Sequence, residues 1–151
     1  MKTIAILAAF AASTTALPAL AQANAAAGES SFKSCKSCHT IQNGDETIVR
    51  GGRTGPNLYG VIGRQAGSYE GFNYSDSLAA AGTAGLVWDE ENLAAFVMDP
   101  KGFLAEYLDD GSARSRMSFK LRQGGEDMAA YLATFSEIEA EEGGEAAESS
   151  N

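Results

Sequence analysis

Apolar side chains recur at helical spacing in three segments of the chain. Residues 126–135 place apolar side chains at i, i+3, i+4 and i+7 behind two acidic residues that suit a helix start. Residues 89–98 carry a second apolar stripe after three acidic residues, and Pro100 stops it. Residues 26–35 place Gly28 and an aromatic side chain on one face. The pattern therefore predicts three helices, the first of which can cross another closely at its glycine.

Between these helices the chain is rich in glycine, and no run alternates cleanly between apolar and polar residues. We therefore predict an all-α fold of about three to five helices with long loops. Three modest helices supply little apolar core for a domain of this size. Something other than side chains is expected to fill the middle.

Both ends of the chain are expected to lie outside the folded domain. Residues 1–23 combine a basic start, an apolar run and small residues, which is typical of a secretory signal peptide cleaved near Ala21 or Ala23. The apolar run is too short to cross a membrane, which needs about 20 residues. Residues 137–151 are rich in glutamate and poor in bulky apolar side chains, which predicts a disordered acidic tail. The domain itself is expected to span residues 24–136.

Composition narrows the class of protein further. The chain has 151 residues, 44% of them hydrophobic, and a formal net charge of −9. This acidic balance argues against nucleic acid as a partner, because such binders neutralise phosphates. Two cysteines and one histidine exclude a disulfide-dense scaffold and a metal site built from several imidazoles. The export signal and the modest cysteine content together favour a bacterial periplasm.

The two cysteines and the only histidine stand together as Cys35-Lys36-Ser37-Cys38-His39. The C-x-x-C-H pattern is typical of covalent c-type haem attachment. Two thiols at this spacing can add to the two vinyl groups of one porphyrin edge, and the next residue can then give its Nε2 to the iron. We therefore expect one haem c on Cys35 and Cys38, with His39 as an axial ligand.

Three other interpretations of the same motif are weaker. A dithiol redox site is expected within a βαβ pattern, which the sequence does not show. A disulfide between Cys35 and Cys38 would close too short a loop to stabilise the fold much. A zinc site would need a fourth ligand, and the chain has no third cysteine or second histidine.

An electron carrier also needs its sixth iron position closed, and a thioether sulfur can close it while raising the potential. Apart from the initiator, the candidates are Met98, Met117 and Met128. Met128 belongs to the apolar stripe of the last helix, and Met98 ends the middle helix, so packing is the expected role of both. Met117 stands in a polar loop with no stripe to join. Its placement therefore favours Met117 as the ligand.

At this point the sequence resembles a family, the class I cytochromes c, and within it the bacterial cytochrome c2 and c550 group close to mitochondrial cytochrome c. The resemblance covers nearly the whole domain. It is carried, in order along the chain, by Gly28 and Phe32, 35–39, 54–60, Gly63-Arg64, 72–76, 88–93, 99–101, 117–119 and 130–132.

The resemblance implies a role for further residues. The Pro56 carbonyl would accept the Nδ1–H of the axial histidine and fix its ring. The positions of Arg64, Tyr74, Trp88 and Ser115 match those that approach the haem propionates, where a cation and neutral donors offset negative charge. The resemblance also strengthens the assignment of Met117 as the axial ligand.

The match departs from the family pattern in places. Phe96 and Leu78 stand where mitochondrial relatives have Tyr and Asn, so the polar network near the methionine side is not carried over. The segments 79–87 and 102–113 are longer than in the shortest members. Their packing is not implied by the resemblance.

A haem with both axial positions filled favours outer-sphere electron transfer over turnover of a substrate. The resemblance implies cytochrome bc1 complexes as donors, and a terminal oxidase or a photosynthetic reaction centre as acceptors. A basic rim near the expected haem edge would steer the protein to an acidic partner although the whole molecule is negative. The rim consists of Lys33, Lys36, Lys101, Arg114, Arg116, Lys120 and Arg122.

The alternatives are a dedicated electron acceptor of one periplasmic dehydrogenase, a haem peroxidase and a ligand sensor. A peroxidase needs an open axial position and distal acid–base groups, yet the chain has a single histidine. A sensor needs a weak or missing sixth ligand. We expect a monomeric electron carrier with no stable insertion into a membrane.

Overall fold

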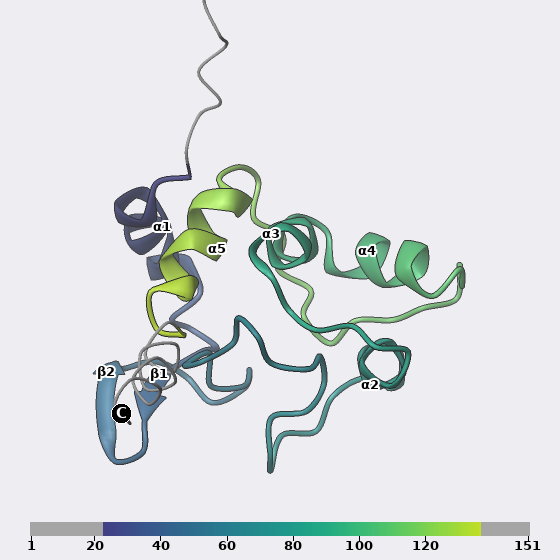
Figure 1. Ribbon diagram of the computed structural model, residues 1–151, viewed down its shortest axis with the longest axis horizontal. Coiled ribbons are helices and arrows are strands. Elements are labelled where there is room, and N and C mark those ends of the chain that lie inside the picture. Colours follow the sequence, from purple (N-terminus) through teal and green to yellow (C-terminus); the bar gives the residue numbers. More distant parts are fainter. Residues whose placement is uncertain (1–22, 137–151) are drawn as a thin grey trace, which may run out of the picture.

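The computed structural model describes residues 23–136, and the expected tail and all but the last residue of the expected signal peptide lie outside them. Five α-helices, one 3₁₀-helix and one hairpin form the described part. The helices are α1 (Ala25–Ser31), η1 (Phe32–Ser34), α2 (Asp76–Thr83), α3 (Glu90–Met98), α4 (Pro100–Tyr107) and α5 (Gly125–Ala133), and the strands are β1 (Ile41–Asn43) and β2 (Glu46–Val49). Figure 1 shows α1, α5 and α3 next to one another, α2 and α4 at the other end, and the hairpin beside the loops.

The first and last helices cross at a glycine, as the sequence predicts. A Cβ at Gly28 would overlap the Asp127 carbonyl and the Tyr131 side chain, so only glycine permits this approach. The ring centroids of Phe32 and Tyr131 lie 5.5 Å apart beside the crossing. Asn24 caps α1 with its side chain and donates its backbone N–H to Asp127 Oδ1 at 2.7 Å. The crossing thus joins the two ends of the domain.

α3 and α4 follow one another with a single residue between them. A capping box starts α3: the Asp89 side chain accepts from the Asn92 N–H, and the Asn92 side chain accepts from the Asp89 N–H. Pro100 ends α3 as expected, but it also begins α4, because proline suits the first position of a helix. The sequence pattern did not predict α4, nor did it predict that the first helix tightens to 3₁₀ geometry before the cysteines.

α2 is a second helix that the apolar pattern did not predict. Half of its eight residues are alanine or glycine and its one large apolar side chain is Leu78, so it carries no strong stripe. Ser75 caps its start by accepting from the Leu78 N–H at 3.3 Å. Gly82 lies so close to the Ala66 carbonyl that a Cβ would overlap it. This close backbone approach, together with the buried Ala81, positions the helix.

The hairpin is a small departure from the all-α expectation. β1 and β2 pair antiparallel, with Asn43 opposite Glu46 and a register irregularity after Ile41. The turn contains Gly44 at φ 53°, a conformation that favours glycine. Of the residues in the two strands only Ile41 is buried, so the sequence shows no alternation of apolar and polar side chains that would predict them.

The core lies between the helices and opens into a cavity. Its fully buried large side chains include Phe32, Ile41, Leu104, Met128 and Leu132. In residues 23–136, no helix is long and apolar enough to cross a membrane.

Candidate functional site

A cavity of ≈ 290 Å³ lies in the middle of the domain, where the sequence predicts a shortage of apolar side chains. It is bounded by loops on one side and by α3 and α5 on the other. All nine residues that the sequence assigns to the cofactor line this one cavity. They are Cys35, Cys38, His39, Pro56, Arg64, Tyr74, Trp88, Ser115 and Met117.

The two cysteines lie in the turn that follows η1. The His39 N–H donates to the Cys35 carbonyl at 2.9 Å, and the Cys38 N–H donates to the same carbonyl at 3.1 Å, so the five-residue motif is wound into one compact turn. Cys35 is partly buried and Cys38 is exposed, and no disulfide joins them. Burial raises the pKa of the Cys35 thiol, whereas hydrogen bonds from Thr54 and then Ser37 lower the pKa of the Cys38 thiol.

The imidazole of His39 is fixed by the loop that faces it. Its Nδ1–H donates to the Pro56 carbonyl at 2.8 Å, which leaves Nε2 as the lone-pair nitrogen for a metal. A Cβ at Gly55 would overlap the ring, so the backbone itself forms the wall on that side. Burial lowers the pKa of His39, against the effect of the Pro56 hydrogen bond. The ring is therefore held neutral, in one tautomer and one orientation, as a metal ligand requires.

The cavity separates the three methionine candidates. Met98 lies outside its lining and is 37% exposed. Met128 lines it from α5 and is 1% exposed within the hydrophobic core. Met117 is partly buried and lines it from a loop, where its N–H donates to Ser115 Oγ at 3.1 Å. Of the two methionines that line the cavity, Met128 therefore lies on a helix within the core, and Met117 lies on the loop where the sequence places it.

Arg64 donates to three backbone carbonyls of the neighbouring loop. The acceptors are Asn57 at 3.0 Å, Tyr59 at 2.7 Å and Gly60 at 3.3 Å. Burial lowers the pKa of its guanidinium. A partly buried cation at the cavity wall can offset negative charge there, as the resemblance implies.

Two aromatic residues complete that part of the wall. Trp88 is buried, its backbone N–H donates to the Arg64 carbonyl at 2.9 Å, and its ring packs against Phe96 with centroids 4.9 Å apart. Tyr74 packs edge-on against Phe72. Burial raises the pKa of the Tyr74 hydroxyl, which keeps the group neutral and able to donate.

The apolar walls were not assigned to the site by sequence reasoning. Leu93, Phe96 and Val97 of α3 and Met128 and Leu132 of α5 line the cavity. Each was predicted as a core residue. The signal that could have assigned them to the site is the shortage of other side chains against which the apolar stripes of α3 and α5 could pack. Their role is to exclude water from the cavity.

Phe96 and Leu78, which stand in place of two polar residues of the family pattern, also line the cavity. Both side chains present only carbon to it. The polar network near the methionine side is therefore not built from these two positions, as the sequence predicts.

The residues present fit a haem. The cavity has two thiols in one turn, a tautomerically fixed imidazole, a thioether on a loop, a cation at one wall and apolar sides. Among residues 23–136, no group of three His, Cys, Asp or Glu side chains could hold a metal ion by itself. The donor set matches the axial chemistry of a low-spin haem.

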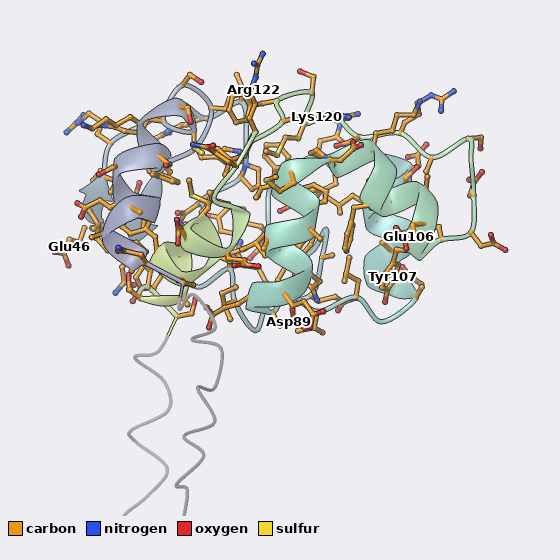
Figure 2. All side chains as sticks on the ribbon, turned by 90° about the horizontal axis from the view of Figure 1, so that it is seen from above. Glu46, Asp89, Glu106, Tyr107, Lys120 and Arg122 are labelled. Carbon is orange, nitrogen blue, oxygen red and sulfur yellow. The ribbon has the colours of Figure 1, made fainter. Side chains whose placement is uncertain are left out.

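The seven basic residues expected at the rim are all exposed. Three make contacts of their own: Arg114 with the Ser112 and Ala113 carbonyls, Arg116 with the Asn73 carbonyl, and Lys120 with Asp99. Figure 2 shows Lys120 and Arg122 along one edge of the molecule and Asp89 at the opposite edge.

Comparison with known proteins gives one consistent family. The chain is 58% identical to cytochrome c-551 of Roseobacter denitrificans over 123 residues, covering 81% of this chain and 88% of the relative. It is 55% identical to cytochrome c2 of Rhodobacter capsulatus over 120 residues, covering 79% and 87%. No family model matches the chain.

Solved structures agree with the sequence comparison. The structure of Rhodobacter capsulatus cytochrome c2 matches with a TM-score of 0.72 at 54% identity, covering 74% of this chain and 97% of that one. A Paracoccus denitrificans cytochrome c2 structure matches with a TM-score of 0.73 at 43% identity, covering 75% and 96%. The chain therefore belongs to the class I c-type cytochromes of the bacterial cytochrome c2 and c-550 group, carries one covalently bound haem c, and is an electron carrier rather than an enzyme.

Proposed function

We propose that this cytochrome is exported to the periplasm by cleavage of residues 1–23 and carries single electrons there from a cytochrome bc1 complex to a terminal oxidase or a photosynthetic reaction centre. The haem supplies a one-electron Fe(II)/Fe(III) couple. The proposal rests above all on one observation, that the nine assigned residues line a single cavity. The acidic segment 137–151 is proposed to lie outside the folded domain of residues 24–136, and the carrier is proposed to act as a monomer.

Each residue of the site has a defined part in this proposal. Cys35 and Cys38 would hold the haem through thioether bonds, and His39, whose ring is fixed by the Pro56 carbonyl, would give Nε2 to the iron. Met117, which lines the same cavity, would supply its thioether sulfur as the second iron ligand. Two ligands held by the protein in this way would lower the reorganisation that electron transfer must overcome.

The wall that contains Arg64 favours the propionate end of the cofactor. Arg64 supplies a cation there, and Tyr74, Trp88 and Ser115 supply neutral donors. The apolar residues of α3 and α5 exclude water from the remaining surface, which raises the potential by disfavouring the charged ferric form. With His39 and Met117 as the two iron ligands, the haem would have no open position for a substrate.

The assignment of Met117 can be tested with a matched pair of variants. Met117→Ala should remove the long-wavelength methionine-to-iron band, allow imidazole to bind tightly and lower the potential strongly in a redox titration. Met128→Leu conserves volume in the core and should keep both the band and the potential near those of the wild type. An unchanged spectrum in Met117→Ala, or loss of the band in Met128→Leu, contradicts the assignment.

The proposed membrane partners can be tested by salt. Exposed charges separated by more than about 8 Å are screened at an ionic strength near 0.15 M. The rate of reaction with purified bc1 complex should therefore fall as salt rises, and more weakly in Lys36→Gln, which removes one rim charge. A rate that does not depend on salt contradicts steering by the basic rim.

A further inference from the structure

The segment that presents Met117 has little regular structure. Residues 108–124 contain no helix or strand in the described part of the chain. The position of the thioether therefore depends on a small number of contacts between this segment and the helices. Segments of this kind open locally at a much lower free energy than the whole domain unfolds.

The part of the segment before Met117 is held toward α2. The Arg114 N–H donates to Ser77 Oγ at 2.9 Å. Arg116 Nη1 donates to the Asn73 carbonyl at 2.9 Å. These contacts fix one side of the loop that carries the methionine.

The part after Met117 is held at the junction of α3 and α4. The Leu121 N–H donates to the Val97 carbonyl at 2.9 Å. One residue earlier, Lys120 Nζ lies 2.6 Å from Asp99 Oδ1, and this is the one salt bridge within residues 23–136. A backbone hydrogen bond and an ion pair thus lie on adjacent residues of the segment.

Asp99 is itself held by the fold. Its N–H ends α3 by donating to the Ala95 carbonyl, and its side chain begins α4 by accepting from the Gly102 N–H at 3.1 Å. The hydrogen bonds from Lys120 and Gly102, in that order, lower the pKa of the Asp99 carboxyl, and the charge of Lys101 adds to the effect. Lys120 therefore pairs with an anion whose position is set by two helices.

We propose that the Asp99–Lys120 pair positions the Met117 segment, and that it holds the thioether in place against competing ligands. The inference rests on the proposed ligation by Met117 and assigns a second role to two residues that the sequence places in separate groups, one as a motif residue and one as a rim charge. Asp99 and Lys120 are positioning residues, because they act on the cofactor through Met117.

The expected size of the effect follows from exposure. Both side chains are about half exposed, so the pair contributes little to global stability. Local opening of the Met117 segment would break the pair, so the whole of this small contribution bears on the opening equilibrium. An exposed ion pair changes such an equilibrium by about two- to fivefold. Imidazole binds the ferric protein only when the thioether has left, so its affinity measures that opening.

The test is an imidazole titration of the ferric holoprotein at low ionic strength, followed by loss of the methionine-to-iron band. Asp99→Asn keeps an acceptor for the α4 cap but removes the charge. Lys120→Gln removes the other charge, and Lys120→Arg keeps it. We expect both charge-removing variants to bind imidazole about two- to fivefold more tightly, and Lys120→Arg to match the wild type.

Lys101→Gln is the matched control, because it removes an exposed positive charge next to Asp99 without breaking the pair. It should leave imidazole affinity unchanged, and the urea midpoint should be similar in all these variants. The double variant Asp99→Asn/Lys120→Gln should bind imidazole no more tightly than either single variant, because each single substitution already breaks the pair. Singles that match Lys101→Gln, or a double effect equal to the product of the two singles, would overturn the proposal.

Failure of this inference differs from failure of the ligand assignment. If Met117 is not the ligand, Met117→Ala keeps the band of the wild type. If Met117 is the ligand but the pair does not position it, the band is lost in Met117→Ala while the pair variants bind imidazole like the control.

Discussion

Helix α5, which crosses α1, and the loop of residues 108–124 both line the cavity, but the crossing and the loop are held by different contacts. At the crossing, Gly28 brings two backbones together and Phe32 packs on Tyr131, all of them buried. The loop is held by single hydrogen bonds and one half-exposed ion pair. The crossing is therefore a close-packed scaffold, whereas the loop that carries Met117 rests on contacts that water and salt can reach.

The largest effect is expected from a methyl group at the crossing. In Gly28→Ala the new Cβ would overlap the Asp127 carbonyl, which is backbone and cannot move aside, so the holoprotein should lose about 3 kcal/mol of unfolding free energy. Gly111→Ala is the matched loop variant, since nothing lies within 4 Å of the position that its methyl group would take, and it should stay within about 0.5 kcal/mol of the wild type. Urea unfolding measures both, and equal effects would remove the contrast.

A smaller effect is expected at the start of α3. Asp89→Ala removes an acceptor of the capping box and should cost about 1 kcal/mol, because the first N–H groups of the helix lose their partner. Asp89→Asn keeps an acceptor and should restore most of the loss. The comparison uses the same urea unfolding curves, and an Asn variant as unstable as the Ala variant would argue against the cap as the cause.

The smallest effect is expected in the loop and depends on pH. The folded pKa of Asp99 lies below its ordinary value of 3.8, so its pair with Lys120 stabilises the protein above that pH and is lost as the pH falls through the lowered pKa. In Lys120→Gln the Asp99 pKa should move back toward 3.8. Carboxyl-carbon NMR titration measures this, with Asp110, whose pKa is lowered by Ser112, as a reference that should not move.

Sequence reasoning found the parts of the molecule that local patterns encode. The stripes of α3 and α5, the glycine of the crossing and the five-residue haem motif can each be identified within a short window. Helix α2 was not predicted because its alanine and glycine residues form no apolar stripe. Helix α4 was not predicted because Pro100 was interpreted as the end of a helix, although proline also suits the first position of one. The hairpin escaped because only Ile41 is buried.

The site was predicted to the extent that the resemblance named single positions. The contacts that assemble it join residues far apart along the chain. The Arg116 to Asn73 hydrogen bond spans 43 positions, and the Asp99–Lys120 pair links a helix junction to a loop. Such pairings depend on the tertiary path of the chain, and a single sequence carries no local signal for them.

The closed turn between His39 and Pro56 sets a limit on insertions. Besides the imidazole hydrogen bond, the Gly52 N–H donates to the Lys36 carbonyl and the Gly55 N–H to the Cys38 carbonyl, both at 2.8 Å. Three hydrogen bonds thus join the haem motif to residues 51–56. An added residue there would tilt the imidazole plane, whereas the hairpin tip at Gly44 has open space around it. A reporter peptide or affinity tag grafted into this cytochrome should accordingly be placed at that tip.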